Sequence, residues 1–248
     1  MSTRSFFNLR ETIPGFIFIL IICLINIEPI RTFTGAEDVG DSTRFLVGVL
    51  TVFSGSTIGF LLSQLWWPIY HLGKLHYFDV WPRFSSKNCI NLLIEKYRLT
   101  EDTSIGSVRN VISVFGFIIH YQGTEKKYET LFTYSTRRWD VYHLLSLTKI
   151  SVILSSIFGY ILRFYILSNS LSYWEGNIPN ILIFMNVLAQ ILLFIGTLIV
   201  SHGWDTVSIA LIKACKLDYI DLLHHFPLHF FNVIRLLDDE KFKLDFYT

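Results

Sequence analysis

The chain has 248 residues, of which 52% are hydrophobic and only 17% are charged, and its formal net charge is +1. Soluble domains carry about 25% charged residues, and nucleic-acid-binding domains carry basic patches. The composition therefore argues against a soluble domain and against a nucleic-acid partner, and the clustering of apolar residues into long runs indicates lipid as the solvent.

Four apolar segments are long enough to cross a bilayer, whose hydrocarbon core of about 30 Å requires about 20 helical residues. They cover residues 13–30, 45–66, 147–167 and 180–201. The first has the charged start of a signal peptide. Its long apolar stretch and the lack of a small-residue cleavage pattern favour a retained helix. We expect Pro14 in the first turn of that helix, where its missing N–H costs nothing.

The number of lysine and arginine residues alternates between high and low along the segments that connect these spans. The central segment 67–146 carries ten of them, whereas the loop 168–179 carries none. The positive-inside rule then predicts a multi-pass protein of the cell membrane with cytoplasmic N- and C-termini. Trp66, Trp67 and Trp204 fall at the predicted inner boundary, where interfacial aromatic residues are enriched.

The predicted fold class is therefore all-α, a polytopic membrane protein with four transmembrane helices and a helical cytosolic region. We expect a first transmembrane hairpin at 1–66, a cytosolic helical segment at 67–146, a second transmembrane hairpin at 147–201 and a cytosolic C-terminal tail at 202–248.

Within the central segment, the spacing of apolar residues predicts helices in 88–99 and in 100–123. From Glu125 the chain runs into the third span without a glycine or proline, which predicts one long helix. The fourth span is expected to continue as a helix beyond Trp204.

Small residues recur at helical spacing on two of the spans. They are Thr51, Gly55, Gly59 and Ser63 on the second span, and Ser151, Ser155 and Gly159 on the third. Because burial cannot drive helices together within lipid, such stripes mark faces of close backbone approach. The first stripe could pack on the second within one chain, or on a neighbouring protomer.

Among the polar residues within the spans, Asn186, Gln190 and Arg163 are candidates for a shared role. Asn186 and Gln190 are four residues apart on the fourth span and share one face, which should point at protein rather than lipid. Arg163 lies late in the third span, where it could snorkel to the outer surface and pair with Glu28 or Glu175. These residues either form interhelical hydrogen bonds or line a hydrated path.

One group of residues could carry chemistry at the inner boundary. Asp140 and His143 precede the third span, and His202 and Asp205 follow the fourth. Two imidazoles and two carboxylates could hold a divalent metal or act as general acids and bases. The alternative is that they anchor helices at the headgroup level and pair with Arg137 and Arg138.

The sequence contains no metalloprotease, nucleotide-binding or nucleophile-elbow motif. We therefore assign no catalytic residue and no cofactor, and we predict a non-enzymatic, homo-oligomeric channel-like or scaffold assembly. Its expected partners are the lipid bilayer, further copies of the chain and a cytosolic protein. The alternatives are a membrane-embedded metal- or lipid-dependent enzyme that uses the Asp/His cluster, and an accessory subunit of a larger membrane complex.

Overall fold

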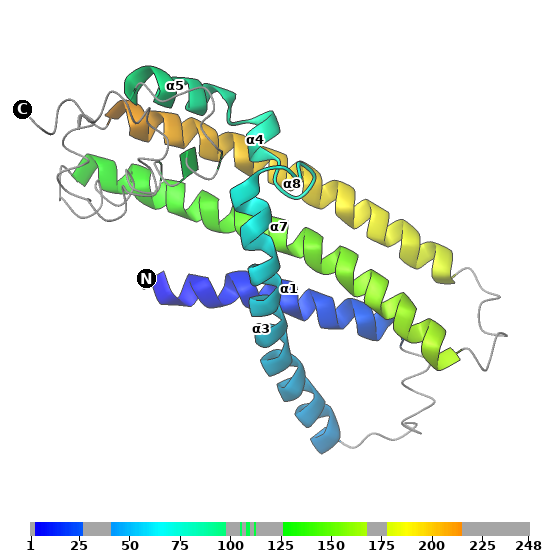
Figure 1. Ribbon diagram of the computed structural model, residues 1–248. Helices are drawn as coiled ribbons and strands as arrows, with labels where there is room; N and C mark the ends of the chain where they lie inside the picture. Colours follow the sequence, from blue (N-terminus) through cyan, green and yellow to red (C-terminus); the bar gives the residue numbers. More distant parts are fainter. Residues whose placement is uncertain are drawn as a thin grey trace, which may run out of the picture. The chain divides into compact units, whose positions relative to one another are not determined.

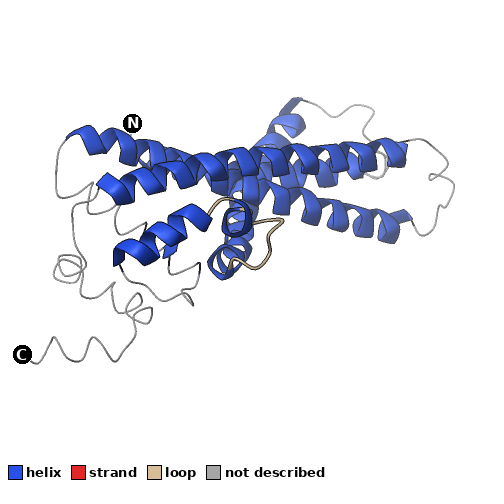
Figure 2. Ribbon diagram, turned by 90° about the horizontal axis from the view of Figure 1, so that it is seen from above, coloured by secondary structure: helices blue, strands red, loops and turns tan. Residues whose placement is uncertain are grey.

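The computed structural model describes residues 3–26, 41–97, 105, 108, 109, 112, 126–167 and 178–214. All regular structure in this part of the chain is helical (Figures 1 and 2). The helices are α1 (Thr3–Ile25), α3 (Asp41–Leu72), α4 (Trp81–Phe84), α5 (Lys87–Tyr97), α7 (Lys126–Leu167) and α8 (Ile178–Ala214). The all-α prediction is confirmed for these residues.

The chain divides into two compact units. Unit 1 comprises Met1–Trp67 and Asp140–Thr197, and unit 2 comprises Pro68–Trp139 and Leu198–Thr248. Helices α3, α7 and α8 each contribute residues to both units. Each unit is described separately below.

Two helices in the described residues are long and apolar enough to cross a membrane. They are Thr133–Tyr165 within α7, with a mean hydropathy of 1.7, and Ile183–Lys213 within α8, with a mean hydropathy of 2.4. Half of the most apolar stretch of α7 is buried, compared with 6% of that of α8. The predicted spans 13–30 and 45–66 are described only in part, because residues 27–30 and the side chains of 45–53 lie outside the described residues.

Helix α7 begins at Lys126 and continues to Leu167 without interruption. It confirms the expectation of one long helix that runs from the segment after Glu125 into the apolar stretch 147–167. Helix α5 confirms the helix predicted in 88–99, and α8 continues past Trp204 as expected. Of the segment 100–123 the structure describes only residues 105, 108, 109 and 112.

The expectation for Pro14 is wrong. Helix α1 begins at Thr3, so Pro14 lies in the interior of the helix and not in its first turn. A proline there cannot donate the backbone hydrogen bond of its turn. Its carbonyl oxygen accepts a hydrogen bond of 2.5 Å from the Ser151 hydroxyl, so the irregular turn lies at a contact with α7.

Helix α3 ends because Gly73 adopts a left-handed conformation, with φ +60°. The Gly73 N–H donates to the Ile69 carbonyl over 3.1 Å, which is the arrangement expected at a glycine C-cap. The chain then turns through residues 74–80 into the short helix α4.

Candidate functional site

Helix α1 lies in direct backbone contact with the small-residue stripe of α3. A Cβ atom added to Gly15 would overlap the Gly55 carbonyl oxygen, and one added to Gly59 would overlap the Glu11 carbonyl oxygen. A Cβ on Gly55 would lie 3.3 Å from the Phe16 nitrogen. The close approach of the α1 and α3 backbones therefore requires the glycines on both helices.

The stripe of α7 contacts α1 as well. Besides the hydrogen bond from Ser151 to Pro14, the Asn26 amide donates to the Gly159 carbonyl over 3.2 Å. A Cβ on Gly159 would lie 2.8 Å from Ile25 Cδ1. Both stripes thus face α1 of the same chain.

Three further members of the two stripes were predicted to lie at helix contacts. Ser63 and Ser155 are buried, and their hydroxyl groups donate to the carbonyls of Phe60 and Val152 in their own helices. The side chain of Thr51 lies outside the described residues.

The polar residues predicted within the spans contact neighbouring helices of unit 1. Arg163 is 6% exposed, and its Nη1 donates to the Ile25 carbonyl of α1 over 2.6 Å. The Asn186 amide of α8 donates to the Ser156 hydroxyl of α7. Gln190 Nε2 lies 3.5 Å from the Lys149 carbonyl oxygen. Glu28 and Glu175, the predicted partners of Arg163, lie outside the described residues.

Unit 1 contains a cavity of about 500 Å³ between α1, α7 and α8. It is lined by Ile17, Ile21, Leu24, Ile25, Thr148, Val152, Ser156, Tyr160, Met185, Asn186, Ala189, Leu192 and Leu193. Of the three polar residues discussed above, only Asn186 contributes to this wall. This cavity is therefore not a hydrated path lined by Asn186, Gln190 and Arg163 together.

Polar groups in the cavity wall already have partners within the protein. The Thr148 hydroxyl donates to Leu144 O over 2.8 Å, and the Ser156 hydroxyl donates to Val152 O over 2.7 Å. The amide nitrogen of Asn186 is bonded to Ser156. The surface that these helices offer to an occupant is accordingly apolar.

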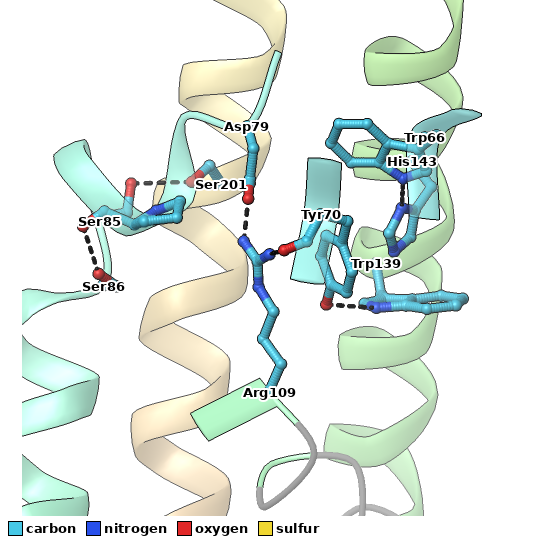
Figure 3. Close-up of polar contacts among 10 residues, drawn as sticks. Trp66, Tyr70, Asp79, Ser85, Ser86, Arg109, Trp139, His143 and Ser201 are labelled. Carbon is cyan, nitrogen blue, oxygen red and sulfur yellow. Dashed lines mark hydrogen bonds and ion pairs between the residues drawn. The ribbon is translucent and has the colours of Figure 1, made fainter. Parts of the chain in front are cut away.

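In unit 1, the two candidate residues before the third span make contacts with other helices. Asp140 lies 3.7 Å from Arg10 Nη1 of α1. His143 is 1% exposed, and its Nδ1 accepts a hydrogen bond from the Trp66 indole (Figure 3). Trp66 is itself 1% exposed, so its side chain packs inside the protein.

The other two candidates belong to unit 2. His202 is exposed, whereas Asp205 is 3% exposed. Trp204, predicted at the membrane surface, is buried and packs on Trp81 with ring centroids 5.1 Å apart. In the described part of the chain, no group of three or more His, Cys, Asp or Glu side chains is placed to hold a metal ion.

An arginine that sequence reasoning did not single out lies buried in unit 2. The Arg109 side chain is 1% exposed, and its Nη2 lies 2.7 Å from Asp79 Oδ1. Its Nη1 donates to the Tyr70 carbonyl (Figure 3). Its guanidinium carbon lies 3.7 Å from the centroid of the Tyr70 ring and 4.8 Å from that of Trp81. The only signal in the sequence is a charge within the apolar run around 107–115.

Lys149 was missed in the same way. It is fully buried in unit 1, and its ammonium lies 5.7 Å from the centroid of the Phe194 ring on α8. A charged side chain inside a long apolar stretch is rare, because burial of an unpaired charge costs free energy. Lys149 is the single charged residue between 141 and 162, and that isolation is a signal that could have identified it.

Burial also changes the ionisation of groups in unit 2. Burial raises the pKa of the Cys89 thiol, and the nearby Asp205 carboxylate raises it further. Partial burial lowers the pKa of His71, and the Arg109 cation lowers it further. Burial raises the pKa of Tyr70, against the opposing effect of Arg109. All three effects favour the neutral forms of these side chains.

Comparison of the chain with protein-family models, with curated proteins and with solved structures gives no match.

Proposed function

We propose that the chain is a four-span integral membrane protein that acts as a non-catalytic, homo-oligomeric scaffold. The observation that carries the proposal is the surface of α8. Residues 176–204 contain no Asp, Glu, Lys or Arg, and large apolar side chains are exposed along this helix. They include Phe184 (65%), Leu192 (61%) and Ile199 (63%). A helix that is apolar on all sides is typical of a membrane span.

The contacts of unit 1 favour a scaffold over a pore. Arg163, Asn186 and Ser151 each bond to another helix of the same chain. These polar groups hold the helices together, which is the usual role of such groups in membrane bundles. Asp140 and His143 likewise contact Arg10 and Trp66, and this supports a role in packing for half of the candidate catalytic cluster.

The two small-residue stripes do not support self-association, because both face α1 of the same chain. The apolar surface of α8 takes their place as the expected interface between protomers. Close packing of membrane helices requires shape complementarity, so a single bulky residue at the interface should disturb it.

Three measurements test the proposal. Resistance of the full chain to extraction from membranes at alkaline pH tests membrane residence, and labelling of single engineered cysteines near each terminus tests cytoplasmic topology. Mass photometry of the protein in nanodiscs tests assembly. We expect an oligomer for the wild type and a lower mass for a set of α8 tryptophan variants, of which Ile199→Trp is the first. A wild-type mass of one chain would refute the homo-oligomer and favour an accessory subunit.

A further inference from the structure

The segment between the end of α3 and the start of α5 presents large apolar side chains to its surroundings. We call residues 72–87 the α3–α5 turn, and its loop is drawn in tan in Figure 2. The exposed large apolar side chains of this turn are Leu72, Leu75, Tyr77 and Phe84. Exposed apolar groups that gather in one place mark an interaction surface.

Two parts of the α3–α5 turn lie against each other. A Cβ atom added to Gly73 would lie 3.1 Å from Pro82 Cγ, so the chain before the loop meets the chain after it. Leu72 and Lys74 flank Gly73, and Arg83 follows Pro82. The exposed apolar and basic side chains next to this contact are therefore near neighbours in space.

The exposed charged side chains of the turn are basic. Lys74, Arg83 and Lys87 are exposed. Asp79 is the single acidic residue between 72 and 94. It is fully buried, and its Oδ1 lies 2.7 Å from Arg109 Nη2. Because Arg109 compensates this carboxylate, the surface of the turn keeps three positive charges and is complementary to an anionic partner.

Contacts on the inner side hold the turn in place (Figure 3). The Ser201 hydroxyl of α8 donates to the Ser85 hydroxyl over 3.0 Å, and the Ser86 hydroxyl donates to the Pro82 carbonyl over 2.7 Å. Together with the ion pair of Asp79, these bonds fix the backbone of the turn from within. A preformed surface binds at a smaller ordering cost than a loose one.

The turn follows closely on a predicted membrane span. The span 45–66 ends six residues before Leu72, and α3 continues as a helix to Leu72, a distance of about 9 Å at 1.5 Å per residue. The headgroup layer on each side of the hydrocarbon core is about 5–8 Å thick. With residues 45–66 in the hydrocarbon core, the turn therefore lies at the depth of the headgroups, where the anionic lipids of the cytoplasmic leaflet attract lysine and arginine.

We propose that the α3–α5 turn binds the anionic phospholipids of the cytoplasmic leaflet. Its basic side chains contact the phosphate groups, and its exposed leucine and aromatic side chains insert between the headgroups. An acidic protein would match the charge equally well, but the short distance from the span favours a lipid surface. The inference rests on the membrane residence proposed above, and it gives the protein a preference for the lipid composition of the leaflet around it.

Photocrosslinking of the full chain in nanodiscs tests this inference. The nanodiscs contain phosphatidylcholine alone or phosphatidylcholine mixed with phosphatidylglycerol. Benzoylphenylalanine replaces Leu75, and mass spectrometry identifies the lipid to which it attaches. The matched probe position is Phe60, because Phe60 lies on α3 within the predicted span and is exposed to nearly the same degree as Leu75, 51% compared with 52%.

One variant removes the basic charges of the turn, and a control variant removes basic charges elsewhere. Lys74→Gln, Arg83→Gln and Lys87→Gln are combined in the first. Arg137→Gln and Lys213→Gln are combined in the control, because both residues are exposed and lie at least about 15 Å along their helices from the predicted spans. Circular dichroism establishes that each protein is folded.

With the probe at Leu75 in mixed nanodiscs, we expect phosphatidylglycerol adducts to exceed the share of this lipid in the bilayer by about fivefold, the gain from one basic side chain near an anionic surface. The triple variant should return the adducts to the bulk lipid ratio, whereas the double variant should keep the enrichment. With the probe at Phe60, the adducts should follow the bulk ratio in every protein.

Adducts at Leu75 in the bulk lipid ratio would overturn the inference, and so would adducts to protein alone, which would indicate a protein partner. An equal loss of enrichment in the double variant would also overturn it, because the preference would then belong to the net charge of the whole chain. A protein that resists alkaline extraction but gives one of these results would refute this inference alone, whereas one that alkali extracts would refute membrane residence.

Discussion

The indole N–H of Trp66 donates a hydrogen bond to Nδ1 of His143, and both side chains are buried in unit 1. An indole nitrogen can only donate, so Nδ1 of the imidazole must carry a lone pair. His143 is therefore neutral in this arrangement, with its proton on Nε2. This bond connects α3 to α7 and gives the buried imidazole a hydrogen-bond donor.

The first prediction concerns this bond. Trp66→Phe keeps an aromatic ring, although a smaller one, and removes the donor, and we expect it to lower the free energy of unfolding by at least about 1 kcal/mol. His143→Phe should have a similar effect, and the double variant should cost less than the sum of the two. Thermal unfolding of the full chain in detergent measures all three. Nitrogen NMR of labelled histidine should show an unprotonated Nδ1 at neutral pH, and an imidazolium signal from His143 would contradict the assignment.

The second prediction concerns the glycines. Gly15→Ala and Gly59→Ala each place a methyl group on a carbonyl oxygen of the facing helix, so we expect each to destabilise the protein by about 1–3 kcal/mol. Gly196→Ala is the control, since its Cβ would meet only Leu145 Cδ1 at 3.5 Å. Alanine is the better helix former by about 1 kcal/mol, so Gly196→Ala should be neutral or stabilising. Equal effects at all three positions, measured by thermal unfolding, would show that α1 and α3 do not approach this closely.

The third prediction concerns the buried ion pair of unit 2. Removal of one member leaves the other charge buried, so Asp79→Ala and Arg109→Ala should each cost about 3–5 kcal/mol. Asp79→Leu combined with Arg109→Met removes both charges and should cost less than either single change. Thermal unfolding of the full chain in detergent compares the three proteins. A double variant that costs as much as the two single changes together would mean that the two charges do not interact.

The fourth prediction concerns Cys89. In the unfolded chain its thiol ionises near its ordinary value of 9.0, whereas burial and Asp205 raise the pKa in the folded chain. Above about pH 9 the unfolded state therefore binds fewer protons, and the free energy of unfolding falls as the pH rises. We expect Cys89→Ala to show a weaker loss of stability than the wild type between about pH 8 and about pH 10.

Reactivity provides an independent check on Cys89. In a Cys23→Ser, Cys215→Ser variant, Cys89 is the single thiol, and the thiol form reacts poorly because the thiolate is the nucleophile. We expect no labelling by a maleimide at neutral pH until denaturant is added. Rapid labelling of the folded protein would place Cys89 at the surface.

The pattern of neighbouring residues in the sequence was enough to predict the helices, but it did not predict which helices contact one another. The unbroken stretch after Glu125 predicted α7, and the spacing around Leu93 predicted α5, because both depend on neighbours in the chain. The partner of Gly55 could not be predicted, since GxxxG identifies a contact face and says nothing of the helix that fills it. Pro14 was misplaced because the helix was expected to begin with the apolar run, whereas α1 already begins at Thr3.

The same contrast between local pattern and long-range contact applies to the candidate site residues. The spacing of Asn186 and Gln190 predicted a shared face, and each side chain lies against a residue of α7. Arg109 gave no comparable pattern, because a buried ion pair is built from residues far apart in sequence and its geometry exists only in the fold. Isolation within an apolar run, as at Lys149, is the one sequence signal that such residues leave.

The position of α1 between two stripes also has a consequence for biosynthesis. Ser56, a partner of Thr12, follows it by 44 residues, and Ser151, the partner of Pro14, follows by 137. At a synthesis rate of about 5–20 residues per second, the second partner emerges roughly ten seconds after α1. Helix α3 is therefore available to α1 before α7 is made, and the first helix translated waits longest for its complete set of neighbours.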